Sequence, residues 1–245
     1  MSPTDFRVKI FADGADLESI ARLAEDPIIA GFTTNPTLMR AAGVTDYEGF
    51  SRSVLELIGT RPISFEVFSD NFDEMRAQAR HIASWGPNVF VKVPVTDTAG
   101  RSTEEVQRDL VADGVQLNVT AVMTLTQVAR IVDCLAGGPP SFLSVFAGRI
   151  ADAGVDPIPT MVASVAAIAD HPEIELIWAS PREVLNIVQA NDIGCQVITV
   201  TPDLLKKLGS VGRDLDEFSL DTVRMFHRDA QSAGYQLDLA AGADR

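Results

Sequence analysis

The stretch Val89-Phe90-Val91-Lys92-Val93-Pro94 sets the pattern on which the fold prediction rests. It is apolar at nearly every position and lacks the apolar/polar alternation of a strand with one face in water. Near-continuous apolarity with β-branched and aromatic side chains is typical of a parallel strand that is covered on both faces. The stretch therefore predicts a buried strand that carries a single lysine.

Seven other stretches have the same character, and helix-like segments separate them. In the segment after residue 70, for example, apolar residues recur at helical spacing from Phe72 to Ala83. Strands that alternate with helices indicate a parallel α/β protein, and eight such units in 245 residues fit one (β/α)8 TIM barrel with eight parallel strands. The predicted strands are Val8–Ala12, Ile28–Phe32, Ile63–Phe68, Val89–Val93, Val115–Val119, Phe142–Phe146, Ile174–Ala179 and Cys195–Val200.

The rest of the chain adds helices but no second domain. After Pro202 the pattern predicts one short helix and then an additional C-terminal helix around Asp221 to Ala233. No low-complexity linker or strong internal repeat divides residues 1–245, so we expect a single barrel domain. The polar tail, approximately residues 238–245, is expected to fray.

Three predicted helices begin with a capping-box pattern, in which a hydroxyl residue precedes Glu or Gln by three positions. These patterns are Thr45 to Glu48, Ser102 to Glu105 and Thr124 to Gln127.

The composition excludes several classes of protein. Hydrophobic residues make up 46% of the chain and charged residues 22%, which is typical of a globular protein with a large core and not of a disordered one. A net charge of −14 argues against nucleic-acid or anionic membrane partners, because phosphates would be repelled on average.

Cys134 and Cys195 form no Cys-x-x-Cys pair, which argues against a disulfide framework or a zinc module. Without a signal-peptide core or an apolar run near the roughly 18 residues of a membrane span, a cytoplasmic protein is expected.

Polar side chains end each of the eight predicted strands. In a parallel barrel the carboxyl ends of the strands meet at one face, so these side chains should line a single cavity. Carboxylates, one lysine, carboxamides, hydroxyls and arginines suit a polyhydroxylated, phosphorylated substrate. In strand order the residues are Asp13, Thr34 with Asn35, Glu66, Lys92, Asn118 with Thr120, Ser144 with Arg149, Ser180 with Arg182, and Thr199 with Thr201.

Lys92 and Glu66 each allow a chemical and a structural interpretation. The apolar neighbours of Lys92 disfavour its charged form, and a neutral amine is the nucleophile that Schiff-base formation requires. Glu66 lies in a strand that otherwise reads as buried, so it needs a partner or a proton, and either suits a general acid/base. The alternative for both is a structural ion pair between them.

The remaining strand-end residues also have simpler explanations. Arg149 and Arg182 are candidates for phosphate capture, although a surface arginine is the commoner case. Asp13 before Gly14 is typical of a turn, and Asn35 before Pro36 is typical of a helix start. The three histidines are scattered along the chain, which gives no support to a metal cluster or a histidine-based triad.

Taken in order, the motifs of this chain resemble those of the transaldolase family, including its short-chain branch with the fructose-6-phosphate aldolases. The resemblance runs from about Ile10 to Leu208, and the ordered set is specific where any single piece would be weak. Pro181 departs from the family pattern, in which an aromatic residue is commoner. The motifs are Phe11-Ala12-Asp13, Gly31-Phe32-Thr33-Thr34-Asn35-Pro36-Thr37-Leu38, Val91-Lys92-Val93-Pro94-Val95-Thr96, Leu117-Asn118-Val119-Thr120, Ser144-Val145-Phe146-Ala147-Gly148-Arg149-Ile150 and Ala179-Ser180-Pro181-Arg182.

The resemblance implies a (β/α)8 barrel whose fourth strand carries the Schiff-base lysine, Lys92. It implies that Asp13 transfers the proton at the substrate hydroxyl during carbon–carbon cleavage, and that Glu66 and Thr120 hold the water used in forming and hydrolysing the imine. The resemblance implies that the substrate hydroxyls or the intermediate are bound by Asn35, Asn118 and Ser144. It implies that the phosphate is bound by Arg149, Ser180 and Arg182. Thr34 and Phe146, at the ends of their strands, are also predicted to bind the substrate.

Two positions favour transfer over simple cleavage. In the family pattern that this chain resembles, the aldolase members have glutamine and tyrosine at the positions of Glu66 and Phe146. A phenol could donate the proton that releases dihydroxyacetone, whereas phenylalanine cannot. The chain therefore resembles a transaldolase that moves a dihydroxyacetone unit from fructose 6-phosphate or sedoheptulose 7-phosphate to an aldose phosphate, as in the pentose phosphate pathway.

Two alternatives remain open: a fructose-6-phosphate aldolase-type lyase and a non-catalytic sugar-phosphate binding protein. The resemblance implies sugar-phosphate substrates and no metal or organic cofactor. Barrels of this kind often associate, so a homo-oligomer is a further expectation, with the C-terminal helix as a candidate contact.

Overall fold

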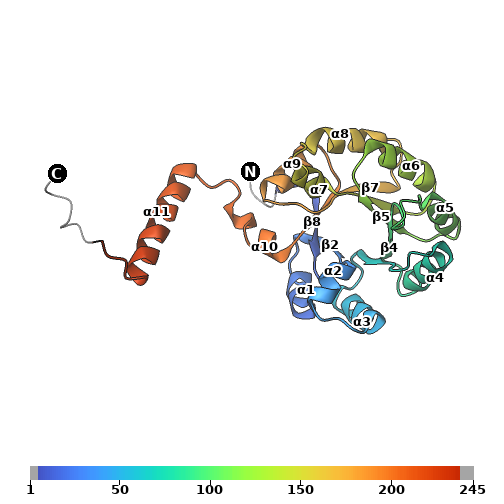
Figure 1. Ribbon diagram of the computed structural model, residues 1–245, viewed down its shortest axis with the longest axis horizontal. Helices are drawn as coiled ribbons and strands as arrows, with labels where there is room; N and C mark the ends of the chain where they lie inside the picture. The colour runs from blue at the N-terminus through green and yellow to red at the C-terminus, as the bar shows by residue number, and fades with distance from the viewer. Residues whose placement is uncertain (1–4, 238–245) are drawn as a thin grey trace.

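Eight strands follow one another in sequence order around a closed barrel in which β8 hydrogen-bonds to β1 (Figure 1). All of the neighbouring pairs are parallel. The structure is a computed structural model that describes residues 5–237. It confirms the predicted barrel, whose strands are β1 Lys9–Asp13, β2 Ile29–Thr33, β3 Ile63–Glu66, β4 Val89–Pro94, β5 Leu117–Val122, β6 Ser141–Val145, β7 Ile174–Trp178 and β8 Val197–Val200.

Strands β5 and β8 begin two residues later than predicted, and the reason is the same for both. Gly114 and Gly194 have φ of 79° and 77°, the left-handed conformation that ends a helix. The next residues, Val115 and Cys195, then donate their N–H groups to helix carbonyls at 2.9 Å. Both are buried apolar residues, but they belong to the helix ends.

Helices pack around the outside of the barrel and cover the strands (Figure 1). Strand side chains are therefore buried on both faces, as the near-continuous apolar runs predict. The helices are α1 Leu17–Ala24, α2 Pro36–Ala41, α3 Tyr47–Ile58, α4 Phe72–Ala83, α5 Glu104–Ala112, α6 Leu125–Leu135, α7 Ala147–Asp152, α8 Ile158–Ala167, α9 Leu185–Asp192, α10 Pro202–Leu205, the 3-10 helix η2 Leu208–Ser210, and α11 Leu215–Ser232.

One of the three predicted capping boxes forms. Thr124 and Gln127 satisfy each other's backbone groups at the start of α6. The prediction at Thr45 is wrong by one residue, because the carboxylate of Asp46 caps α3 by accepting from Gly49 N at 2.9 Å. The prediction at Ser102 is wrong as well, since α5 begins after Thr103 without a side-chain cap.

Inside the barrel, an aromatic layer lies beneath a polar layer. Residues two apart on a strand face the same side, so Phe11 lies one step below Asp13, Phe90 below Lys92, and Phe142 below Ser144. The Phe142 ring lies 5.4 Å from that of Phe11 and 4.3 Å from that of Phe90. Because these apolar rings fill the middle of the barrel, the polar side chains at the carboxyl ends of the strands pack against apolar groups beneath them.

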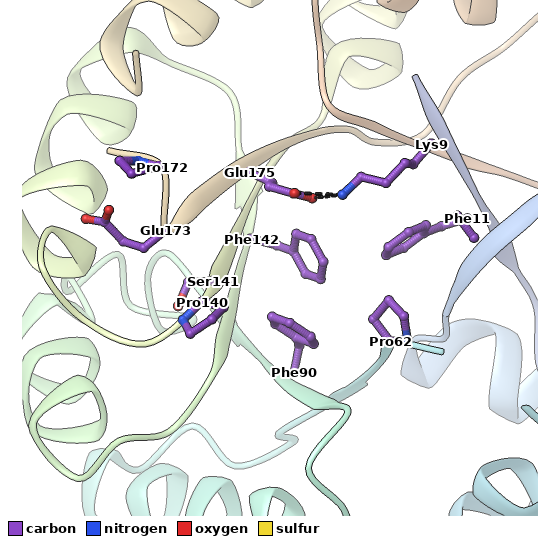
Figure 2. A pocket seen from close by; sticks show the side chains of 11 residues that line it. Lys9, Phe11, Pro62, Phe90, Pro140, Ser141, Phe142, Pro172, Glu173 and Glu175 are labelled. Carbon is purple, nitrogen blue, oxygen red and sulfur yellow. Dashed lines mark hydrogen bonds and ion pairs between the residues drawn. The ribbon is translucent and has the colours of Figure 1, made fainter. Parts of the chain in front are cut away.

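A hollow of about 340 Å³ lies below the aromatic layer, at the amino ends of the strands. Figure 2 shows the rings of Phe11, Phe90 and Phe142 gathered there beside the ion pair between Lys9 and Glu175. The aromatic layer thus separates this hollow from the polar side chains at the carboxyl ends.

The additional C-terminal helix, α11, extends away from the barrel beyond α10 (Figure 1). It begins after Asp214, whose carboxylate accepts from two backbone N–H groups of the first turn. No residue of α11 is buried, although large apolar side chains lie along it. The predicted fraying of residues 238–245 lies outside the described residues.

Across residues 5–237, none of the helices is both long and apolar enough to cross a lipid bilayer.

Candidate active site

A cavity of about 440 Å³ opens at the carboxyl ends of the strands. Of the strand-end residues and Phe146 predicted for the site, only Thr34, Arg182 and Thr201 do not line it. The lining residues are Asp13, Thr33, Asn35, Pro36, Thr37, Leu38, Glu66, Lys92, Asn118, Thr120, Ala121, Ser144, Phe146, Arg149, Ala179, Ser180 and Thr199.

Lys92 projects into this cavity from the middle of β4 and is 7% exposed. The strand residues on either side of it, Val91 and Val93, are fully buried. The Lys92 Nζ donates to the Thr34 carbonyl oxygen at 3.1 Å and lies 3.3 Å from Glu66 Oε2. The amine is therefore shielded from bulk water and has one carboxylate within reach.

Glu66 ends β3 directly opposite Lys92, its partner in the register of β3 and β4. Its side chain is 18% exposed, so the carboxylate reaches the cavity from a largely buried position. The ion pair foreseen as the structural alternative is thus present in the described structure. It is also the geometry that proton exchange between amine and carboxylate would require.

Asp13, the last residue of β1, faces the same cavity. Its Oδ1 accepts a hydrogen bond from Thr33 Oγ1 at 2.8 Å. Burial raises the pKa of Asp13 above its ordinary value, although the charge of Lys92 and the Thr33 hydrogen bond lower it. A carboxyl that holds its proton more tightly than usual is a better acceptor and donor of protons during a reaction than an ordinary surface carboxylate.

Side chains of strands β3, β5 and β6 form a chain of hydrogen bonds inside the barrel. Ser144 Oγ donates to Asn118 Oδ1 at 2.7 Å, and Asn118 Nδ2 donates to Ser64 Oγ at 2.9 Å. These contacts fix the orientation of the Asn118 amide beside Lys92. Within residues 5–237 the buried Oγ1 of Thr120 has no protein hydrogen-bond partner, which leaves it available to a ligand or a water molecule.

Asn35 serves the start of α2 as well as the cavity. Its Oδ1 accepts from Leu38 N at 3.0 Å, which is the helix-start role expected for an Asn–Pro pair. With that oxygen engaged, the Asn35 amide nitrogen is the group left to donate to a bound molecule.

The arginines occupy different positions at the cavity rim. Arg149, on α7, lines the cavity. Arg182 does not, because its Nε donates to Asp152 Oδ1 at 2.9 Å and its Nη1 donates to Ser180 Oγ at 3.1 Å. Through Ser180, which lines the cavity, Arg182 lies one hydrogen bond from it.

Backbone strain is concentrated at this rim. Among the described residues other than glycine, Ala121 and Ser180 have positive φ, at 63° and 62°, and both line the cavity. Such conformations cost about 1–3 kcal/mol and tend to occur at functional sites.

Gly148, at the start of α7, lies against the carbonyl of Ser180. A Cβ added at Gly148 would lie 1.6 Å from the Ser180 oxygen. Only glycine therefore permits this approach of α7, with Arg149, to the segment that carries Ser180.

Several residues that line the cavity were not predicted, whereas Thr34 was predicted and does not line it. Thr33 lies two residues before Asn35, so the two-residue period of a strand could have indicated it. Pro36, Thr37 and Leu38 come from the first turn of α2, which lies beyond the strand ends. Thr34 is buried, and its contribution is the carbonyl that accepts from Lys92.

A protein-family model described as Transaldolase/Fructose-6-phosphate aldolase matches residues 10–238. Curated proteins named "Probable transaldolase" are similar over most of their length. The protein from Dehalococcoides mccartyi is 33% identical over 202 residues, which cover 82% of this chain and 90% of the relative. The protein from Streptococcus equi subsp. equi is 31% identical over 203 residues, with coverage of 82% and 90%.

Solved structures match the fold at much lower identity. The type I 3-dehydroquinate dehydratase from Clostridium difficile has a TM-score of 0.57 and 12% identity, with 84% of this chain and 91% of that chain covered. The structure of KGPDC from Streptococcus mutans has a TM-score of 0.54 and 10% identity, with coverage of 79% and 88%. These two likenesses concern the barrel alone.

Proposed function

The chain belongs to the transaldolase/fructose-6-phosphate aldolase family, and on this premise we propose that it is a transaldolase that works through a Schiff base at Lys92. It would transfer a dihydroxyacetone unit from fructose 6-phosphate or sedoheptulose 7-phosphate to an aldose phosphate. One observation carries the proposal: a buried lysine amine lies 3.3 Å from Glu66 in a cavity that also contains Asp13.

In the first step the Lys92 amine attacks the ketone carbon of the donor. The resulting carbinolamine loses water to give an iminium ion, and the oxygen of the ketone departs as that water. Glu66 is the carboxylate within reach of Nζ for the accompanying proton transfers, and the unpaired Oγ1 of Thr120 can help to hold the water.

Cleavage of the carbon–carbon bond then requires a base at the neighbouring hydroxyl. Asp13 takes that proton while the bonding electrons move to the iminium ion, which becomes an enamine, and an aldose phosphate leaves. The enamine attacks the carbonyl carbon of the acceptor, and Asp13 returns the proton to the new hydroxyl. Water then hydrolyses the product iminium ion and frees Lys92. The raised pKa of Asp13 supports this two-way role.

Binding of the substrate would be divided between two regions of the cavity. Asn35, Asn118 and Ser144 would hold hydroxyl groups of the sugar near Lys92. Arg149 and Ser180 would hold the phosphate at the rim, with Arg182 behind Ser180. A guanidinium presents paired donors to phosphate oxygens, and the negative net charge elsewhere makes such a local positive group necessary.

We expect Gly148→Ala to weaken binding of the phosphate. The new Cβ cannot coexist with the Ser180 oxygen, so α7 and Arg149 must move away from Ser180. The KM for fructose 6-phosphate should rise by about tenfold or more, equivalent to about 1.4 kcal/mol. Steady-state kinetics would measure it, with Gly209→Ala as the control because nothing lies within 4 Å of a Cβ there. An unchanged KM in a folded variant would contradict the assigned phosphate position.

Transfer, as opposed to cleavage, is supported by the cavity residue Phe146. A phenylalanine ring has no proton to give to the enamine, so the bound three-carbon unit should wait for an aldehyde acceptor.

The proposed activity is tested by incubating the protein with fructose 6-phosphate, alone and with erythrose 4-phosphate. We expect glyceraldehyde 3-phosphate to be released continuously only when the acceptor is present. Without it, release should stop at about one equivalent of enzyme, because the enamine persists. Fast continuous turnover without the acceptor would instead identify a lyase. Binding of the sugar phosphate without either reaction would identify a non-catalytic binding protein.

The C-terminal helix supports assembly into a homo-oligomer. Leu215, Phe218, Val223, Met225 and Phe226 lie on one side of α11 and are all 42% or more exposed. In proteins most of the stability of a helix comes from the packing of its apolar face. Because every copy of this protein carries the same helix, a second copy is the proposed partner for this face.

Phe226→Glu should therefore reduce the molecular mass of the assembly in solution. The glutamate places a charge at the centre of the apolar face, where burial would be costly. Size-exclusion chromatography with light scattering would measure the mass, and Gln231→Glu on the opposite side of α11 adds the same charge as a control. Monomeric unmutated protein, or equal masses for both variants, would exclude assembly through this face.

A further inference from the structure

Strand β3 loses its neighbour on one side just where it carries Glu66. The register of β2 and β3 covers Phe32 with Ile63 and Thr33 with Ser64, and Thr34 N donates to Ser64 O at 3.2 Å. Beyond Thr34 the chain leaves the sheet and enters α2, whose first residue, Pro36, has no backbone N–H to donate. No strand continues beside Glu66 on this side.

The backbone groups of Glu66 both point toward this missing neighbour. In a parallel strand the N–H and C=O of one residue face the same side, and successive residues alternate. Val67 N donates to Lys92 O at 3.1 Å on the β4 side, so Glu66 faces the β2 side. Without another partner, a donor and an acceptor at the rim of the cavity would both lack protein contacts.

The hydroxyl of Tyr47 takes the place of the missing strand. Tyr47 Oη donates to Glu66 O at 2.7 Å and accepts from Glu66 N at 2.9 Å. One phenol thus supplies both hydrogen bonds that a neighbouring strand would have made. The contact spans 19 positions of sequence and joins the first residue of α3 to the last residue of β3.

The Tyr47 ring is held in place from both sides. Its centroid lies 5.5 Å from that of Phe68 and 6.0 Å from that of Trp85. Trp85 packs in turn against Phe65, one residue before Glu66, at 5.6 Å. Burial raises the pKa of Tyr47 above its ordinary value, so the phenol keeps its proton and remains a donor at neutral pH.

From this geometry we infer that Tyr47 is a positioning residue, which acts through the backbone of Glu66 to hold the Glu66 carboxylate beside Lys92. The inference rests on the proposed role of Glu66 in proton transfer at the imine. Tyr47 touches no substrate group, because it is not among the residues that line the cavity at the carboxyl ends. Its effect reaches the chemistry only through the 3.3 Å contact between Glu66 Oε2 and Lys92 Nζ.

Loss of the hydroxyl should separate catalysis from binding. In Tyr47→Phe the ring can still pack on Phe68 and Trp85, but the N–H and C=O of Glu66 lose their partner and the end of β3 can move. The groups proposed to hold the sugar and its phosphate, such as Asn35 and Arg149, lie on other elements and keep their positions. A displacement of about 1 Å at a reacting group can cost about 100-fold in rate.

The test compares Tyr47→Phe with the unmutated protein and with Tyr235→Phe, which alters the other tyrosine of the chain at an 81% exposed position. We expect kcat for transfer from fructose 6-phosphate to erythrose 4-phosphate to fall about 10- to 100-fold in Tyr47→Phe, with KM within about twofold. Borohydride trapping of the Lys92 adduct should slow in parallel. Tyr235→Phe should match the unmutated protein.

A double-mutant cycle distinguishes positioning from general structural support. If Tyr47 acts through Glu66, Tyr47→Phe should cause little further loss of kcat in a Glu66→Gln background. Provided that the unmutated protein traps its adduct, three results would each overturn the inference. They are equal losses of kcat in both backgrounds, a raised KM at unchanged kcat, and an unaltered kcat. An unmutated protein that traps no adduct would overturn the proposed function, and the inference with it.

Discussion

Replacing Lys92 with methionine should lower kcat by about 10⁴-fold or more, because Lys92 is the nucleophile of the covalent step in the proposed mechanism. Methionine is similar in length and suits a position that is 7% exposed between two fully buried valines, so the barrel should fold. Glu66 loses its ion-pair partner, but it is partly exposed and can bind water in its place. Turnover of fructose 6-phosphate with erythrose 4-phosphate is the measurement.

The same variant also decides where the Schiff base forms. Borohydride reduction of the unmutated protein with fructose 6-phosphate should leave one stable adduct, which peptide mass mapping should place on Lys92. Lys9→Met is a matched control, since Lys9 is a barrel lysine paired with a glutamate at the opposite end of the strands. It should keep both turnover and adduct. An adduct on another lysine, or a Lys92→Met variant that still turns over, would refute the assignment.

Asp13→Asn should lower kcat by about 10²- to 10⁴-fold, the usual contribution of a positioned acid/base. Asparagine keeps the size of the side chain and can still accept the Thr33 hydrogen bond, but it cannot take the proton from the hydroxyl when the carbon–carbon bond breaks. In the proposed mechanism imine formation depends on Lys92 and Glu66, so the variant should still form its adduct.

This retained adduct makes the prediction specific to one step. Trapping should recover the full six-carbon sugar on Lys92 in Asp13→Asn, whereas the unmutated protein should yield the three-carbon fragment in the absence of an acceptor. Mass spectrometry of the reduced peptide separates the two. Asp203→Asn, at the surface beside Lys206, should behave as the unmutated protein. If Asp13→Asn yields the three-carbon adduct at the normal rate, Asp13 is not the base for cleavage.

The two variants therefore test different parts of one proposal. Lys92→Met removes the covalent bond, and Asp13→Asn stops the reaction after that bond has formed. Tyr47→Phe, which rests on the same mechanism, should slow trapping without stopping it.

The sequence by itself determined the barrel and the face on which the cavity lies. Eight buried strands appeared as near-continuous apolar runs because both faces of each strand pack against protein, and this local pattern needs no knowledge of distant residues. The side chains at the strand ends indicated most of the cavity lining for a similar reason. Parallel strands in a closed barrel all end at one face, so Asp13, Glu66 and Lys92 had to converge.

Tertiary structure alone decided which groups meet across the sequence. The carbonyl of Thr34 reaches Lys92 over 58 positions, and Arg182 is paired with Asp152 over 30 positions and does not line the cavity. The contact of Tyr47 with Glu66 arises because the pairing of β2 with β3 stops at Ser64 and the first residue of α3 reaches the unpaired edge of β3. Strand register and helix packing set such contacts, and the sequence pattern of one element carries no record of where a side chain from another element will lie.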